Sequence, residues 1–214
     1  MLTDWEIRRS IVGYGKRVHN AGLVAATDGN ISVRIMGDRA MITPSGSVLG
    51  NLNPDQLLYV DFSGNVLSGR GKPSSELPMH IAIYKKRPDV SAIIHTHPPV
   101  ATAFSIARIS LSEPVLPEVV VGLGDIPISP YATPGTPEGA AILEGIIETH
   151  DVIILDHHGA VAVGKTLEEA FQKMEKLEHA ARTILAAHQL GGVSVLPDRE
   201  VEKLKAIREQ SGYK

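Results

Sequence analysis

The chain of 214 residues has no cysteine, no excess of basic residues and no long apolar run. Without cysteine there are no disulfides or thiolate ligands, so any bound metal must be held by nitrogen and oxygen atoms. With 21 Lys and Arg against 24 Asp and Glu, the net charge of −3 offers no basic footprint for nucleic acid. No stretch approaches the roughly 20 apolar residues that cross a bilayer, and the acidic residues 1–6 lack an apolar signal core. We therefore expect a cytoplasmic protein with neither a nucleic-acid nor a membrane partner.

The residues that are present indicate one folded α/β domain. Hydrophobic residues make up 43% of the chain and charged residues 21%, which are values typical of globular proteins. The length suits one domain with a proper core better than two, so we predict a single domain over residues 1–214. Short β-type runs interleave with helical patterns and no repeat is visible, which favours a mixed sheet between helical layers.

Capping signals and apolar periodicity place the individual elements. Thr3–Glu6 and Thr166–Glu169 read as capping boxes, each at the start of a helix. Pro54 opens a short helix after Asn53, and Pro78 must lie in the first turn of its helix, where its missing N–H costs least. The predicted longer helices are 3–22, 75–87, 99–107, 136–149, 166–190 and 200–209. The predicted strands are 30–35, 39–43, 58–61, 65–67, 92–97, 126–129, 152–156 and 160–163.

Histidines at the ends of two apolar runs are the strongest chemical signal. His95 and His97 follow Ile93-Ile94 at a spacing of two, so on a strand both imidazoles point to the same face. Two imidazoles begin a divalent-metal site, and a catalytic zinc site usually takes three protein ligands. The third ligand would be His157 or His158, after the run 152–155, and spacing alone does not choose between them. For the first pair taken alone, a packing role is an equal alternative.

Glu76 is the candidate acid/base group. It follows Ser74 and Ser75 at the predicted start of a helix. Local sequence favours the ordinary interpretation, a carboxylate at the positive end of a helix dipole with serine caps. The alternative is a carboxylate that moves a proton beside the metal, with a pKa set by the cation. His80, one helical turn later, is expected to be a packing residue.

Three small polar clusters are candidates for holding a phosphate. They are Thr27–Asn30, Thr43–Gly46 and the Ser74-Ser75 pair. Hydroxyls, an amide and backbone N–H groups near a helix start can hold a phosphate without a lysine. Each cluster taken alone is also typical of a plain turn.

Taken together and in order, these motifs and Pro130–Thr133 resemble the class II aldolase/epimerase family, over nearly the whole chain. The resemblance implies a mixed, mostly antiparallel sheet between helical layers, and a homotetramer with its sites between subunits. It implies zinc bound by His95, His97 and His158, with Mn²⁺, Co²⁺ or Fe²⁺ as other possible metals. Glu76 would be the acid/base and a fourth ligand when substrate is absent. The implied phosphate ligands are Thr27, Gly29, Asn30, Thr43, Ser45, Gly46, Ser74 and Ser75.

The resemblance also indicates a reaction. Glutamate after the two serines is similar to the aldolase branch, whereas the epimerases carry aspartate there. This implies reversible cleavage of a sugar 1-phosphate, such as L-fuculose 1-phosphate or a 5-deoxypentulose 1-phosphate. The products would be dihydroxyacetone phosphate and a small aldehyde, formed through a metal-bound enediolate. The alternative on the same scaffold is a pentulose-5-phosphate 4-epimerase.

The aldehyde side of the site departs from the family pattern. Pro134 stands where the fuculose-phosphate aldolases have an aromatic residue, and Val115–Glu118 replaces an expected tyrosine. Glu118, Tyr131 and Tyr213 are the candidates left for this side. A non-catalytic interaction domain would not need three histidines and Glu76, and a metallohydrolase would want more aspartates than Asp156 near them.

Overall fold

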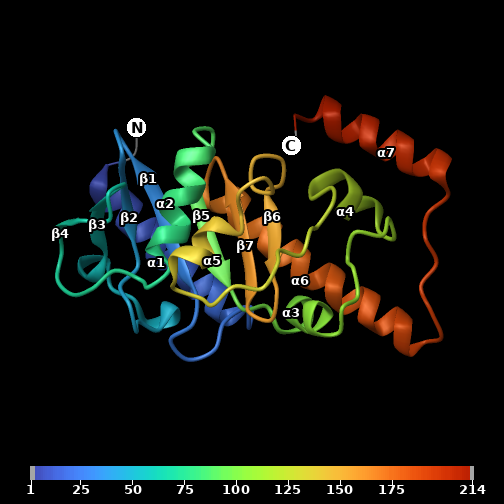
Figure 1. Cartoon of the computed structure of the whole chain (residues 1–214), viewed down its shortest axis with the longest axis horizontal. Helices are drawn as coiled ribbons and strands as arrows, with labels where there is room; N and C mark the ends of the chain where they lie inside the picture. The colour runs from blue at the N-terminus through green and yellow to red at the C-terminus, as the bar shows by residue number, and fades with distance from the viewer. Residues whose placement is uncertain (1–2, 213–214) are drawn as a thin grey trace.

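The computed structural model describes residues 3–212, and its centre is a seven-stranded sheet (Figure 1). The strand order is β4-β3-β2-β1-β5-β7-β6, and each pair of neighbours is antiparallel. The predicted sheet is thus confirmed, with its parallel component reduced to an isolated bridge between Ile128 and Ile154. The strands are β1 (Asn30–Ile35), β2 (Arg39–Ile42), β3 (Leu58–Asp61), β4 (Val66–Ser68), β5 (Ala92–Thr96), β6 (Val152–Leu155) and β7 (Gly159–Gly164).

Helices cover both faces of this sheet, as predicted. One face carries α1 (Asp4–Asn20), α3 (Pro99–Ile106) and α6 (Leu167–Gln189), and the other carries α2 (Leu77–Lys86) with α5 (Pro137–Ala141) packed against it. Two further helices, α4 (Pro117–Gly122) and α7 (Asp198–Gln210), contact each other at one end of the long axis (Figure 1). Two single-turn 3₁₀ helices are η1 (Leu49–Asn51) and η2 (Pro54–Gln56).

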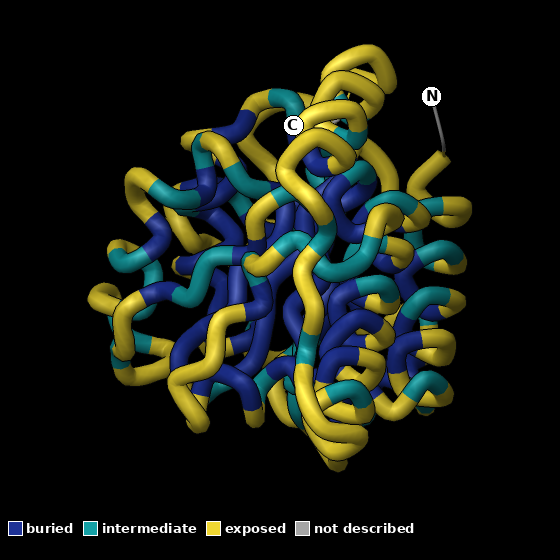
Figure 2. The backbone as a smooth tube through the Cα atoms, turned by 90° about the vertical axis from the view of Figure 1, so that its right-hand side faces the viewer, coloured by how far each residue is buried: buried dark blue, intermediate teal, exposed yellow. Residues whose placement is uncertain are grey.

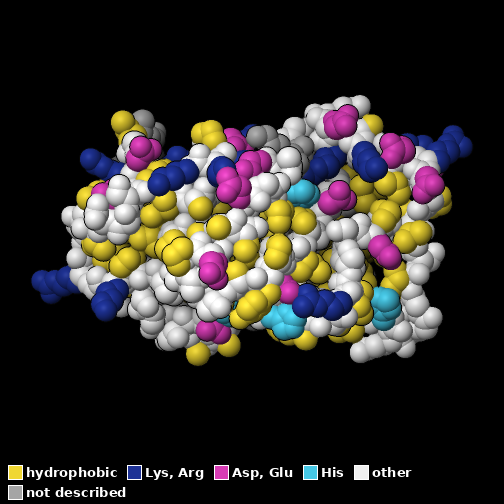
Figure 3. Space-filling view, viewed as in Figure 1, with side chains coloured by type: hydrophobic (Ala, Val, Ile, Leu, Met, Phe, Trp, Pro, Cys, Tyr) yellow, Lys and Arg dark blue, Asp and Glu magenta, His cyan; other side chains and the backbone are white. Residues whose placement is uncertain are grey.

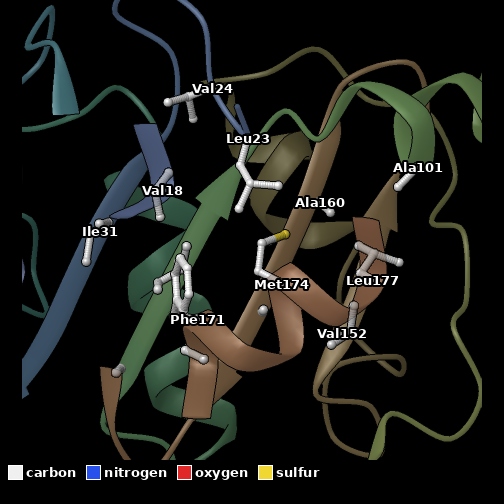
Figure 4. Close-up of a cluster of buried hydrophobic side chains, with 14 of the residues drawn as sticks. Val18, Leu23, Val24, Ile31, Ala101, Val152, Ala160, Phe171, Met174 and Leu177 are labelled. Atoms are coloured by element: carbon white, nitrogen blue, oxygen red, sulfur yellow. The ribbon is translucent and has the colours of Figure 1, made fainter. Parts of the chain in front are cut away.

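An apolar core lies on each face of the sheet. Along β5 the side chains alternate, so that Ile94 belongs to the core under α6 and Ile93 to the core under α2. In Figure 4, Phe171, Met174 and Leu177 of α6 point toward the strands. Figure 2 shows the buried backbone of the central strands, with exposed segments on the outside.

Most of the predicted boundaries are confirmed. Thr3 and Glu6 form the predicted capping box, Thr166 caps α6, and Pro78 lies in the first turn of α2. The helix predicted over 136–149 was wrong beyond its first turns, because α5 ends at Ala141 and turns follow. Gly145 has φ +83°, a conformation that a right-handed helix cannot contain.

Helix α4 was not predicted, although Pro117 at its first position is a typical start signal. Among the helices of the described residues, none is long and apolar enough to cross a bilayer. On the face shown in Figure 3, basic and acidic side chains are interspersed with apolar ones.

Candidate active site and metal centre

Strand β5 delivers two of the three histidines. His95 is fully buried and faces α2, because it lies two residues after Ile93 on the same side of the strand. His97 follows the end of β5 and is partly exposed, and its N–H donates to the carbonyl of Leu23 at 2.9 Å. The two histidines therefore lie on the same face of the strand, as predicted, and the ring of His95 is far more buried than that of His97.

The turn between β6 and β7 supplies the third histidine, and the structure selects His158. Its ring centroid lies 4.8 Å from that of His95 and 4.7 Å from that of His97. His157 instead has φ +58°, and its Nδ1 lies 2.8 Å from a carboxylate oxygen of Asp156. The left-handed residue rotates the chain, so that only the second histidine of the pair points into the cluster.

The donor atoms of these residues fit a divalent metal. His95 Nδ1 must donate to the carbonyl oxygen of Ala160 at 2.9 Å, so the neutral, metal-binding form of the ring carries its lone pair on Nε2. That Nε2 lies 3.2 Å from His97 Nε2, close to the roughly 3.3 Å expected between two nitrogens on one tetrahedral zinc. One ligand atom from each of the three histidines lies within 4.8 Å of the others. The three rings could thus hold a divalent cation.

Glu76 lies against this cluster at the N-terminus of α2. Its Oε2 is 2.7 Å from His95 Nε2, and its Oε1 is 3.6 Å from His158 Nε2. The side-chain amide of Asn30 also donates to Oε2, at 3.1 Å. Ser74 Oγ accepts from the backbone N–H of Glu76 at 3.2 Å. The carboxylate is therefore placed as a possible fourth ligand, and Ser74 bonds the backbone of Glu76 rather than its carboxylate. The expected serine cap was wrong, because no side chain caps α2.

Burial and charge set the protonation states of the site. Burial alone would raise the pKa of Glu76, but His95, His158 and the hydrogen bond from Asn30 outweigh it and hold that pKa well below its usual range. Burial first, and then the charge of His95, lower the pKa of His158 to about 4. The pKa of His97 is also lowered, mainly by burial. At neutral pH the carboxylate is thus ionised, while His97 and His158 are neutral and able to bind a metal.

The loops that carry two of the predicted phosphate-binding clusters lie side by side. Pro44 and Pro73 form an antiparallel bridge, and the N–H of Ser74 donates to the carbonyl of Thr43 at 3.3 Å. Ser45 and Gly46 continue one loop, and Ser75 the other, all three exposed. The hydroxyl of Thr43 accepts from the N–H of Ile31 at 3.2 Å, which joins this region to β1.

The third cluster is split by the fold. Gly29 has φ +76°, and a β-carbon there would lie 2.9 Å from the carbonyl oxygen of His95, so this position needs glycine. Asn30 is buried with its amide directed at Glu76, whereas Thr27 is exposed in the preceding turn. Asp28, for which no individual role was predicted, lies 3.5 Å from His97 Nδ1 and can orient that ring.

The residues predicted for the aldehyde side do not lie together in the structure. Tyr131 is 60% exposed, with its ring 6.3 Å from that of His157. Its loop, residues 130–136, lines a small pocket beside Glu76 together with Ser75 and His158. Glu118 is exposed in the first turn of α4 and is not among the residues that line this pocket. Tyr213 lies outside the described residues.

Comparison with known proteins gives consistent matches over the length of the chain. Residues 9–185 match the family model of the Class II Aldolase and Adducin N-terminal domain. A 3-oxo-tetronate 4-phosphate decarboxylase of Haemophilus influenzae is 34% identical over 208 residues, covering 95% of this chain and 98% of its own. A 5-deoxy-D-ribulose 1-phosphate aldolase of Bacillus thuringiensis serovar kurstaki is 35% identical over 210 residues, covering 96% of each chain. The solved structure of an L-fuculose 1-phosphate aldolase superposes with a TM-score of 0.86 at 32% identity, covering 97% of this chain and 96% of that one.

Proposed function

The chain belongs to the Class II Aldolase and Adducin N-terminal domain family, and on that premise we propose that it is a zinc-dependent aldolase. It would cleave a ketose 1-phosphate reversibly to dihydroxyacetone phosphate and a small aldehyde. The observation that carries this proposal is the buried Glu76 carboxylate set against His95, His97 and His158. Two similar proteins are named as aldolases of 5-deoxy-D-ribulose 1-phosphate and L-fuculose 1-phosphate, which supports this substrate class.

The residues of the site have distinct tasks in this reaction. A divalent cation held by the three histidines would act as a Lewis acid toward the substrate ketone. In the direction of synthesis, the ionised Glu76 removes a proton from the hydroxymethyl carbon of dihydroxyacetone phosphate and leaves an enediolate. In the direction of cleavage, the hydroxyl of the aldol carbon loses its proton as the carbon–carbon bond breaks, the aldehyde departs, and Glu76, once protonated, delivers a proton to the enediolate carbon. Glu76 is ionised at neutral pH and can therefore accept a proton.

The phosphate would lie on the loops of Thr43, Ser45, Gly46, Ser74 and Ser75. The backbone N–H groups of Thr43, Ser45 and Ser74 already donate to carbonyls. The serine hydroxyls and the N–H groups of Gly46 and Ser75 are the neutral donors left for a phosphate close to the start of α2. A phosphate bound there is distant from the bond being cleaved, so its binding energy orients the reacting carbons without chemistry of its own.

A decarboxylation is the second candidate, because the relative of Haemophilus influenzae covers nearly the whole chain and is named as a decarboxylase. Loss of carbon dioxide from a 3-oxo acid that bears a 2-hydroxyl also leaves an enediolate. Glu76, after taking up a proton from water, would then deliver it to the carbon that lost the carboxylate. The same geometry thus suits both reactions, and they differ only in the fragment that departs.

A substrate panel separates these reactions. Purified zinc-loaded protein is incubated with 5-deoxy-D-ribulose 1-phosphate, L-fuculose 1-phosphate, 3-oxo-tetronate 4-phosphate and a pentulose 5-phosphate. Dihydroxyacetone phosphate is read through a coupled dehydrogenase, and carbon dioxide is read separately. Release of the triose from a ketose 1-phosphate, abolished in Glu76→Gln, is the expected result. Carbon dioxide release with no aldol cleavage would select the decarboxylase, and epimerised pentulose without free triose would select the 4-epimerase.

We also propose that the 214 residues act as one domain within a homotetramer whose sites lie between subunits. The position of Glu118 supports this, because Glu118 is exposed and does not line the pocket beside Glu76 in its own chain. Light scattering behind a sizing column should give four times the mass of the 22.9 kDa chain. A monomeric mass in a fully active preparation would contradict it.

A further inference from the structure

Two buried stripes of polar side chains face each other behind Glu76. On α2, Glu76, His80 and Tyr84 recur every four residues and so share one helical face. On β1, Asn30 and Ser32 are two residues apart and share one strand face. All five side chains are buried between the helix and the sheet, where Figure 1 shows α2 passing over β1 and β5.

The two stripes interlock through four hydrogen bonds. Tyr84 Oη lies 2.8 Å from Ser32 Oγ, which lies 2.6 Å from His80 Nδ1. On the other side of the ring, His80 Nε2 lies 2.5 Å from Asn30 Oδ1. Asn30 Nδ2 then lies 3.1 Å from Glu76 Oε2, and this oxygen lies 2.7 Å from His95 Nε2. An unbroken chain therefore runs from the core under α2 to the metal centre.

The hydrogen bond that Asn30 donates to Glu76 fixes the direction of every other bond in this chain. A carboxylate only accepts, so the amide nitrogen of Asn30 must face it and the amide oxygen must face His80. That oxygen also only accepts, so His80 must carry its hydrogen on Nε2. Nδ1 then accepts from Ser32, whose oxygen accepts from Tyr84.

The ring of His80 stays neutral, since burial and the charge of His95 lower its pKa to about 3. A neutral imidazole has one N–H, which agrees with donation from Nε2 alone. All four donors thus point toward Glu76, and aligned hydrogen bonds of this kind strengthen one another in a buried environment.

We propose that His80 is a positioning residue for the acid/base Glu76, acting through Asn30. The network holds Oε2 in place, while Oε1 lies farther from its histidine neighbour, at 3.6 Å from His158 Nε2. Oε1 is therefore the oxygen that exchanges a proton with the substrate. The primary amide of Asn30 donates a fixed hydrogen and does not pass protons along, so the chain orients Glu76 without relaying protons to it. This inference rests on the proposed role of Glu76.

The first test needs no substrate. Protein labelled with ¹⁵N, with and without zinc, is examined by long-range ¹H–¹⁵N correlation of the histidine rings, and His80 is assigned by its loss in His80→Gln. The expected spectrum shows His80 as the neutral Nε2–H tautomer at pH 7. A ring protonated on Nδ1, or on both nitrogens, would overturn the proposal.

The second test compares variants in the zinc-loaded protein, by the rate of deuterium exchange into dihydroxyacetone phosphate. His80→Leu should lower kcat about 10- to 100-fold, with KM and zinc affinity within about twofold. His80→Gln, whose amide can still donate to Asn30, should recover kcat to within about fivefold of the wild type. Tyr84→Phe removes only the last donor of the chain and keeps the ring stacked on Phe62. It should lower kcat by less than His80→Leu does.

Two outcomes would overturn the positioning role. One is a kcat of His80→Leu within twofold of the wild type, and the other is a loss in His80→Gln as large as in His80→Leu. If the wild-type protein itself shows neither exchange nor turnover, the proposed function fails. In that case the NMR measurement of the His80 tautomer still tests the hydrogen-bond network, because it needs no turnover.

Discussion

A single methyl group added at Gly159 should disturb both the sheet and the metal centre. Gly159 begins β7, directly after His158, and faces β5. A β-carbon built there lies 2.3 Å from the carbonyl oxygen of Thr96 and 2.8 Å from Cδ2 of His97. A carbon–oxygen contact needs about 3.3 Å, so the carbonyl must retreat by roughly 1 Å. Because Thr96 lies between His95 and His97, this movement is passed directly to two of the proposed metal ligands.

The cost of Gly159→Ala follows from two terms. Overpacking a well-packed site costs about 1–3 kcal/mol, and a weakened hydrogen bond between β5 and β7 adds about 1 kcal/mol. The metal-free protein should therefore lose about 2–4 kcal/mol of unfolding free energy in urea. Displaced ligands should also weaken zinc binding at least about tenfold in a competition titration.

Gly13→Ala is the matched control for this prediction. Gly13 lies inside α1, and a β-carbon there would meet no atom within 4 Å. The same chemical change should here stabilise the protein by about 0.5–1 kcal/mol and leave zinc affinity unchanged. If Gly159→Ala matched the wild type in both measurements, the tight contact between β7 and the histidine strand would be refuted.

Three further predictions concern the metal, the helix contacts and the dependence of stability on pH. His158→Ala should abolish stoichiometric zinc binding in calorimetry, whereas His157→Ala should keep the zinc affinity within about twofold; the reverse pattern would contradict the assigned ligand. Glu178 of α6 is buried and accepts two backbone N–H groups at the start of α3, at 3.1 and 3.0 Å. Glu178→Ala should lower the unfolding free energy by about 2–4 kcal/mol in urea, and a loss below about 0.5 kcal/mol would contradict that role. The pKa of His80 falls from 6.5 to about 3 on folding, so below pH 6.5 the unfolded chain binds a proton there that the folded protein does not. The stability that the neutral His80 contributes to the folded protein is therefore complete above about pH 6.5 and is lost as the pH falls toward 3. The unfolding free energy of the metal-free wild type should fall by at most about 5 kcal/mol more than that of His80→Leu over this interval, and equal pH slopes would contradict it.

The parts of the site that depend on local sequence were predictable. Alternation along β5 placed His95 and His97 on one face, and the structure confirms it. The helix predicted from Ser75 begins at Leu77 without a side-chain cap, and Glu76 lies at its N-cap position beside the two serines. Such signals involve only residues within one turn or one strand, so they can be recognised from the sequence alone.

The choice of His158 over His157 was not predictable from spacing. It depends on the left-handed conformation of His157 in the turn between β6 and β7, which ends the alternation of the strand. The resemblance to a known family indicated His158, and the ring distances agree with it.

The network behind Glu76 was missed for a different reason. The stripe of Glu76, His80 and Tyr84 is visible in the sequence at intervals of four, but its partners lie on β1, about 50 residues earlier. Only the packing of α2 on β1 brings the stripes together. His80 is therefore a buried histidine, as expected, and also a hydrogen-bonded one.

Deuterium exchange into dihydroxyacetone phosphate, followed by NMR, tests most directly the claim that Glu76 moves a proton beside a bound metal. Zinc-loaded wild type, chelator-stripped wild type and zinc-loaded Glu76→Gln are measured side by side, each with its metal content determined. Exchange at the hydroxymethyl carbon should occur only in the zinc-loaded wild type, while Glu76→Gln keeps its metal. Exchange in Glu76→Gln at the wild-type rate, or none in fully loaded wild type with or without an aldehyde, would contradict the account.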